Sequence, residues 1–242
     1  MGMIFNGQSS WDHGLIITAY PSLNHGAKRA EAYQIAGRNG TFYREEGTFD
    51  NYIQTYEVAV REKNRRADLR AADIAAWLMA PGFCRLEDSF EPEFFKMARY
   101  AGPLNIEQIL GKYGICTLEF DCRPERWLKS GEEPITIVSA GSVFNPTAYD
   151  SKPLIKLWGS NTLTFSVNGD TYMDVTGQGS DGPVIIDCDA GTVTDGSGNN
   201  IMGVVTFYHT YNDFPKLSPG ANTVVFGSNV SSFQIVPRWW TL

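Results

Sequence analysis

The sequence is poor in the residues that most often build metal centres and acid–base sites. Its 242 residues include four cysteines and three histidines, and Cys84, Cys116, Cys122 and Cys188 form no CxxC pair. Cys116 and Cys122 are an even number of residues apart on one expected strand, so they share a face but lie too far apart to bond. We therefore expect buried, reduced thiols, with no metal site and no cofactor.

Segments that would direct the chain to a membrane are also missing. Residues 1–6 have no basic region and no long apolar core, so we expect no secretory signal peptide. No apolar run approaches the length of a bilayer-spanning helix. The protein is therefore expected to have no membrane partner.

Positive charge is scarce, with a formal net charge of −7. A nucleic-acid-binding surface normally carries clustered lysine and arginine. The most basic stretch, residues 61–70 (REKNRRADLR), is interleaved with acidic residues. We interpret it as a solvated helix face, and binding in a nucleic-acid groove is the alternative.

Common catalytic motifs are absent as well. The chain has no G-x-S-x-G elbow, no Walker loop and no H-E-x-x-H. Asp170 and Asp174 flank an expected hairpin turn, where they are either an acid pair for glycoside hydrolysis or ordinary turn carboxylates. His209, in an aromatic stretch, is expected to be packed rather than catalytic. We assign no catalytic residue and expect the protein not to be an enzyme.

Two acidic stretches raise the question of calcium binding. One contains Asp187 and Asp189, and the other is residues 195–199 (DGSGN). The second lacks the acidic ladder and closing glutamate of an EF-hand loop. A β-turn rich in Asp, Gly and Asn is the simpler interpretation.

The abundant signal is that of β-structure. In residues 162–167, Leu163, Phe165 and Val167 alternate with polar residues, which is typical of a half-buried strand. Asn168-Gly169 follows and predicts a type I′ hairpin, because both residues accept positive φ. Turn signals recur at short spacing through the second half, which predicts a β-sandwich. Its expected strands are residues 135–138, 153–158, 163–167, 172–175, 184–187, 193–194, 204–208, 222–226 and 233–236.

The first half predicts a mainly β domain with one helix. The helix is expected at residues 66–80, where Leu69, Ile74, Trp77 and Leu78 recur at helical spacing as core residues, and Pro81-Gly82 ends it. Residues 37–40 (GRNG) predict a tight turn with positive φ. The expected strands are residues 15–20, 33–35, 41–43, 52–60, 83–86, 94–100 and 114–122, the last ended by Pro124.

The polar junction at residues 126–133 predicts a boundary between two domains, residues 1–131 and 132–242. Near the end of the chain, Trp239 and Trp240 are adjacent on an expected strand. Their side chains therefore point to opposite faces. One is expected to enter the core, while the other faces solvent or a neighbour. Exposed tryptophans suit a protein interface or a sugar-stacking platform, and burial of both is the alternative.

An ordered set of motifs along nearly the whole chain resembles the distal tail protein (Dit) family of siphophages and prophages of Gram-positive bacteria. Each motif alone is typical of turns and strands in many proteins, and the resemblance depends on the order in which the motifs occur. The motifs are residues 35–40 (IAGRNG), 75–78 (AAWL), 118–124 (LEFDCRP), Asn145-Pro146 with 151–155 (SKPLI), 214–222 (FPKLSPGAN) and 237–242 (PRWWTL).

The resemblance implies a fold and a function. The first domain would be a tail-tube-like β-sandwich with one α-helix that closes into a hexameric ring, and the second a galectin-like β-sandwich outside it. The homo-hexamer would link the tail tube protein to the tail-associated protein and possible receptor-binding proteins in the virion tail tip, after assembly in the host bacterial cytoplasm. A ring with net negative charge would let DNA pass without binding the DNA phosphates strongly.

Candidate interface or structural positions follow from these motifs. A ring subunit presents two complementary surfaces, so exposed strands and edge aromatics are expected interface material. The alternative function is a carbohydrate-binding β-sandwich module that uses the C-terminal tryptophans. The candidate positions are Arg38, Asn39, Gly40, Trp77, Asn145, Pro146, Pro237, Arg238, Trp239 and Trp240.

Overall fold

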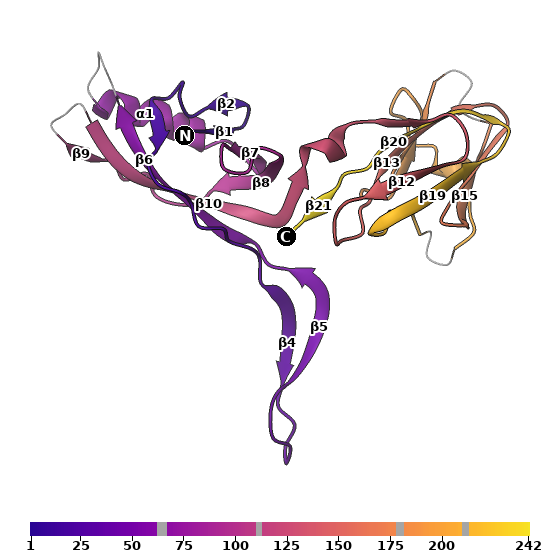
Figure 1. Cartoon of the computed structure of the whole chain (residues 1–242), viewed down its shortest axis with the longest axis horizontal. Helices are drawn as coiled ribbons and strands as arrows, with labels where there is room; N and C mark the ends of the chain where they lie inside the picture. The colour runs from indigo at the N-terminus through magenta and orange to yellow at the C-terminus, as the bar shows by residue number, and fades with distance from the viewer. Residues whose placement is uncertain (62–66, 110–112, 178–181, 210–212) are drawn as a thin grey trace. The chain divides into compact units, whose positions relative to one another are not determined.

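The computed structural model describes residues 1–61, 67–109, 113–177, 182–209 and 213–242. The chain divides into two compact units, unit 1 with residues 1–126 and Leu242, and unit 2 with residues 127–241 (Figure 1). Each unit has its own hydrophobic core. Gly131, after which the sequence placed the junction, lies in unit 2, where a Cβ at this position would be 2.3 Å from the Trp239 backbone nitrogen.

Unit 1 is built mainly of strands. Apart from β4 and β5, its described strands form one sheet in the order β2-β1-β7-β8-β10-β6-β3, with β9 paired to β10. The Ile17 N–H in β3 donates to the Met1 carbonyl beside β1 over 3.0 Å, so the two ends of the sheet approach each other. The strands are β1 (Met3–Phe5), β2 (Gln8–Ser9), β3 (Leu15–Ile17), β4 (Lys28–Tyr33), β5 (Phe42–Phe49), β6 (Tyr52–Arg61), β7 (Cys84–Asp88), β8 (Phe94–Tyr100), β9 (Glu107–Ile109) and β10 (Tyr113–Leu128).

Strands β6 and β10 show how the sequence pattern becomes a core. They pair antiparallel with Leu118 opposite Tyr56, and both side chains are fully buried. The intervening Glu57 and Glu119 point to the opposite face and are exposed. Burying an apolar side chain of this size contributes about 1.5–3 kcal/mol, so this alternation selects one register.

The prediction that Pro124 ends β10 is wrong, because β10 continues to Leu128. The recorded pairing of β10 with β6 ends at Cys122 opposite Tyr52. Beyond that point the missing N–H of Pro124 costs no hydrogen bond to β6, so a proline is tolerated in extended backbone.

Helix α1 (Ala67–Leu78) lies between β6 and β7 and is the helix predicted by the 3.6-residue spacing. Ile74, Trp77 and Leu78 are buried in the core of unit 1. The Trp77 indole donates to the Phe5 carbonyl over 3.0 Å, which joins the helix to β1. The side chain of Leu69 and the basic residues 62–66 lie outside the described part of the chain. Among the described residues, no helix is both long and apolar enough to cross a membrane.

Unit 2 is a β-sandwich. Apart from the short β21, its described strands form two five-stranded sheets, β11-β20-β13-β16-β17 and β12-β19-β14-β15-β18. One core contains residues from both sheets, and Phe165 meets Phe233 across them with ring centroids 5.6 Å apart. The strands are β11 (Ile135–Ile137), β12 (Gly141–Asn145), β13 (Leu154–Gly159), β14 (Thr162–Val167), β15 (Asp170–Thr176), β16 (Val184–Asp187), β17 (Thr192–Thr194), β18 (Val205–Phe207), β19 (Gly220–Phe226), β20 (Val230–Val236) and β21 (Trp240–Thr241), with short 3-10 turns at Lys129–Glu132 and Met202–Val204.

In unit 2 the structure confirms a predicted hairpin and contains a strand that the sequence did not predict. The Asn168-Gly169 hairpin between β14 and β15 is confirmed, with φ of 55° and 88° at the two turn residues. Strand β12 was not predicted, because its inward positions alternate Val143 with a polar residue, Asn145. An asparagine at a core position breaks the apolar period on which the sequence argument depends.

Candidate assembly interface

The hairpin of β4 and β5 is the least buried part of unit 1. We call residues 28–49 the arm. Among the described strands, these two pair only with each other, from Lys28 opposite Phe49 to Tyr33 opposite Phe42 (Figure 1). Every residue of β4 is exposed, and Phe42 and Tyr43 in β5 keep 56% and 62% of their surface. A lone two-stranded hairpin with bare aromatics gains little from burial, so it is candidate interface material.

The base of the arm, in contrast, is firmly held. The Asp50 N–H donates to the Ala27 carbonyl over 2.8 Å, and a Cβ on Gly26 would lie 2.0 Å from the Asp50 carbonyl oxygen. The buried Gln54 amide donates to the Ser22 carbonyl, and the Asn24 amide to that of Ile53. The position and direction of the arm are therefore set by packing that only glycine permits at residue 26.

The predicted residues Arg38, Asn39 and Gly40 lie at the tip of the arm. Gly37 and Gly40 have φ of 79° and 87°, whereas Asn39 is outside the left-handed region. The expected positive φ is therefore carried by the two glycines. The Arg38 N–H donates to the Ile35 carbonyl over 3.1 Å and closes the turn. The Arg38 residue is exposed.

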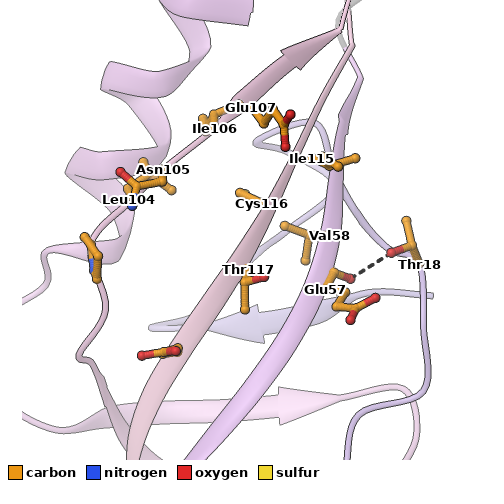
Figure 2. A pocket seen from close by; sticks show the side chains of 12 residues that line it. Thr18, Glu57, Val58, Leu104, Asn105, Ile106, Glu107, Ile115, Cys116 and Thr117 are labelled. Atoms are coloured by element: carbon orange, nitrogen blue, oxygen red, sulfur yellow. Dashed lines mark hydrogen bonds between the residues drawn. The ribbon is translucent and has the colours of Figure 1, made fainter.

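A groove of about 820 Å³ is lined by residues of β6, β10 and the segment that leads into β9. Figure 2 shows Glu57 and Val58 from β6, Ile115 and Thr117 from β10, and Leu104, Asn105, Ile106 and Glu107 from the segment that precedes and enters β9. The Thr18 hydroxyl donates to the Glu57 carbonyl over 3.1 Å and borders the groove on the β3 side.

The lining of the groove mixes apolar and acidic residues. Ile115 keeps 47% of its surface there, and Leu104 and Ile106 are half-buried. Glu57, Glu107 and Glu119 are exposed, and in the described part of the chain no ion pair involves them. Three unpaired carboxylates beside bare apolar side chains are suited to a partner that is both basic and apolar.

A buried ionic cluster ties four strands of unit 1 together. Lys96 in β8 lies 3.5 Å from Asp88 and 2.8 Å from Glu91, which also pairs with Arg126 in β10. The Tyr56 hydroxyl in β6 donates to Asp88 over 2.7 Å. Burial favours a raised pKa for Asp88, but Lys96, this hydroxyl and two backbone N–H groups outweigh it and hold the pKa below its ordinary value. The cluster is an internal network that joins these strands, and among the described residues the Nε of Arg126 in it is buried without a hydrogen-bond partner.

Asn145, Pro146 and Pro237 belong to a turn network in unit 2. The Asn145 amide donates to the carbonyls of Tyr149 and Leu217, each over 2.9 Å, and its oxygen accepts from Thr147. Pro146 is exposed, whereas Pro237 is buried and its carbonyl accepts from the Ser151 hydroxyl over 2.7 Å. In unit 2 these contacts organise the chain between β12 and β13.

The adjacent tryptophans point to opposite faces, as the strand geometry predicts. Trp239 is 4% exposed and belongs to the core of unit 2, so it has no free face for a sugar. Trp240 stacks on Tyr149 with ring centroids 4.5 Å apart, and its indole donates to the Asp150 carbonyl. The alternative function needs exposed tryptophan faces for stacking on a sugar. Trp239 is instead buried in the core, and Trp240 is stacked on Tyr149 within unit 2.

Arg238 sits between them with φ of 57° and makes a two-pronged contact with Asp187, at 2.7 and 2.9 Å. These hydrogen bonds, together with backbone N–H donors from Ala190 and Asp189, lower the pKa of Asp187 to about 2 despite its partial burial. The acidic stretch considered for calcium is thus used in an internal ion pair.

The remaining candidates for chemistry are also held in local contacts. Asp195 accepts from the backbone N–H groups of Ser197 and Asn199, which makes the second acidic stretch a turn. Asp174 accepts from the Tyr208 hydroxyl over 2.6 Å, and His209 stacks on Tyr172. Within the described residues no three His, Cys, Asp or Glu side chains gather as a metal site, and all four cysteines are free.

The sequence reasoning nominated Arg38, Asn39 and Gly40 at the tip of the arm, but it missed the strands of the arm and the groove as surfaces. The arm has a signal that could have been used, because its strands, KRAEAY and FYREEGTF, have little of the apolar alternation seen at residues 162–167. The groove has none, since it forms only when residues 103–107 lie beside β10.

A solved structure matches this architecture over the full length of the chain. The crystal structure of the Dit protein (gp 19.1) of SPP1 matches with a TM-score of 0.77 over 100% of this chain and 99% of that chain, at 16% sequence identity. That protein is described as a paradigm of the hub adsorption apparatus in phages that infect Gram-positive bacteria.

The chain has the Dit fold. No family model and no curated protein matches the sequence, so this likeness rests on three-dimensional structure. It covers both units, and it agrees with the mainly β, two-sandwich architecture that the resemblance implied.

Proposed function

We propose that the chain is a structural hub of a phage tail tip and not an enzyme. The observation that carries this proposal is the full-length likeness to SPP1 Dit, in which neither chain has a large unmatched part. In this proposal, residues 1–131 form the tail-tube-like domain and residues 132–242 a galectin-like sandwich. Six copies close into a ring that joins the tail tube protein to the tail-associated protein and to receptor-binding proteins.

The surface of unit 1 supports a ring subunit. A ring built from one kind of chain needs two different surfaces that meet head to tail. The arm and the groove are two such surfaces, since both expose apolar side chains that a monomer leaves in water. The net charge of −7 would let DNA pass the lumen without a strong phosphate contact. The ring would be part of the virion, assembled in the host cytoplasm.

The mass of the purified chain in solution tests this proposal. We expect light scattering to give about six subunits over a range of protein and salt concentrations, and negative-stain images to show rings. A variant in which Asn-Gly replaces residues 28–49 should remain folded, because Ala27 and Asp50 already face each other across a hydrogen bond. That variant should be monomeric.

A wild-type chain that stays monomeric at every concentration would contradict self-closure of the ring. Glycan binding by such a monomer would favour the carbohydrate-binding module instead. As a control for loop shortening in general, the exposed turn at residues 196–198 in unit 2 can be replaced, and this change should leave the ring intact.

A further inference from the structure

We propose that Asn39, at the tip of the arm, is a site of spontaneous covalent modification, where the side-chain amide is lost through reaction with the backbone nitrogen of Gly40. Two other Asn-Gly pairs occur in the chain, Asn6-Gly7 and Asn168-Gly169. The structure holds both of them in ways that oppose the same reaction. The inference goes beyond the proposed function, because the reaction needs no second copy of the chain.

The reaction is a ring closure followed by hydrolysis. The Gly40 nitrogen attacks Cγ of Asn39, an N–Cγ bond forms, the Cγ–Nδ2 bond breaks, and ammonia leaves with the proton of the Gly40 N–H. Water then opens the succinimide ring at one of its two carbonyl carbons. Cleavage of the N–Cγ bond gives aspartate, and cleavage of the original peptide bond gives isoaspartate. Water is the one co-reactant, and either product carries a carboxylate in place of the neutral amide.

The three Asn-Gly pairs offer the attacking nitrogen equally well. Glycine has no Cβ to crowd that nitrogen. A Cβ built on Gly7, Gly40 or Gly169 would meet no other heavy atom within 4 Å. All three asparagines are exposed to solvent as well. The difference between the sites must therefore lie in how each asparagine is held.

Asn168 is held at both ends of its carboxamide. Its Nδ2 donates to Oδ1 of Asn222 over 2.9 Å, and its Oδ1 accepts from the Thr223 N–H over 2.9 Å. The backbone is also fixed, since Asn168 has φ of 55° in a two-residue turn closed by Val167 opposite Asp170. Ring closure would require rotation of the carboxamide away from both partners, so we expect this site to react slowest.

Asn6 is an intermediate case. It has φ of 50° in the turn between β1 and β2, where Phe5 lies opposite Gln8. Its N–H donates to the Arg85 carbonyl over 3.0 Å. No hydrogen bond between described residues holds its carboxamide. The backbone is therefore constrained while the side chain can rotate.

Asn39 has neither constraint. It lies in the longer loop of residues 34–41, between Tyr33 and Phe42, and outside the left-handed region. Among the described residues, no hydrogen bond engages its carboxamide or the Gly40 N–H. Rotation about the Cα–C and Cα–Cβ bonds of Asn39 can thus bring Cγ to the nitrogen without breaking a native contact, which is what a close approach of reacting atoms requires.

The product would change the arm chemically. A carboxylate beside Arg38 makes the chain, which has a net charge of −7, more negative. Isoaspartate also adds a carbon to the main chain at the tip. Because residues 34–41 carry no core side chain, the rest of unit 1 should keep its structure after the reaction.

Peptide mapping by mass spectrometry tests the inference. The purified chain is incubated at mildly alkaline pH, and each Asn-Gly peptide is followed for the mass change from NH2 to OH and for isoaspartate. We expect Asn39 to react faster than Asn168 by about tenfold or more, with Asn6 between them, since a displacement of about 1 Å from attack geometry can cost about two orders of magnitude in rate.

Two controls assign the effect to the fold. In guanidinium chloride the three pairs should react at similar rates, because the turns and the hydrogen bonds of Asn168 are then lost. The variant Asn39→Gln should abolish the fast mass change and leave the circular dichroism melt unchanged, since residue 39 is exposed and glutamine would have to close a larger ring. Equal rates for Asn39 and Asn168 in the folded chain would overturn the inference, as would a faster reaction at Asn6 than at Asn39.

The inference and the proposed function fail separately. A monomeric chain that modifies Asn39 first supports the inference and counts against self-closure of the ring. If rings form, the Asn39 rates in ring and monomer fractions can be compared. A slower reaction in the ring would show that a neighbour covers the arm tip, and a ring in which Asn168 reacts as fast as Asn39 in the monomer would overturn the inference and leave the hub.

Discussion

Two hairpins in this protein contain the same Asn-Gly pair and have opposite surroundings. The β14–β15 hairpin turns at Asn168-Gly169, and its first strand buries every second residue. The arm contains Asn39-Gly40 at its tip, and its first strand buries none. The difference lies in the strands, because Leu163, Phe165 and Val167 supply an apolar face and residues 28–33 do not. A turn motif selects where the chain reverses, and the flanking side chains decide whether the hairpin joins a core.

The largest expected difference between the two hairpins comes from removing one aromatic side chain from each. Phe165→Ala should lower the free energy of unfolding of unit 2 by about 3–5 kcal/mol, because the ring packs against Phe233 with almost no exposed surface. Phe42→Ala should change the unfolding of the isolated chain by less than about 0.5 kcal/mol. Guanidinium titration measures both, and a similar cost for the two would show that the arm is packed in solution.

The next test adds a methyl group at each turn. Gly169→Ala and Gly40→Ala both place alanine at φ near +88°, and in neither case would the new Cβ meet another atom within 4 Å. Backbone strain is then the common effect, at about 1–2 kcal/mol. We expect it to lower the thermal stability of unit 2 for Gly169→Ala and to leave every unfolding transition unchanged for Gly40→Ala, since the arm carries no core. A shifted transition for Gly40→Ala would contradict this.

The smallest test compares an ion pair from each region. The pKa of Asp187 is lowered to about 2 by Arg238, so its contribution to stability is present above the ordinary Asp pKa and is lost as pH falls through about 2. Asp187→Asn should cost about 1–2 kcal/mol at pH 7, after allowance for the exposed part of the carboxylate, and progressively less towards pH 2.

The arm supplies the control for this pH series. Glu45 pairs with Lys28, and both side chains are about half exposed. Glu45→Gln should therefore change stability by less than about 0.5 kcal/mol at any pH between 2 and 7. Denaturant titrations across that range would detect a difference, and an equal pH dependence for the two variants would show that exposure does not separate the pairs.

Local patterns were sufficient for much of the fold. Period-2 alternation predicted β6, β10 and β14, and 3.6-residue spacing predicted α1, because each pattern reflects one buried face of one element. The adjacent positions of Trp239 and Trp240 required opposite faces, and one side chain is indeed in the core. Strand β12 was not predicted because Asn145 occupies a buried position, where it donates a hydrogen bond to a carbonyl distant in sequence, that of Leu217.

What the chain alone determined is therefore the local part: where strands, helix and tight turns lie, and which side of each is apolar. Long-range contacts decided the rest. Pro124 is tolerated because the pairing of β10 with β6 ends at Cys122, and the arm is exposed because no second apolar layer of described residues covers it. The groove exists because residues 103–107 lie beside β10. Such contacts join residues whose separation in sequence carries no periodic signal, so they become visible only when the sheet is assembled.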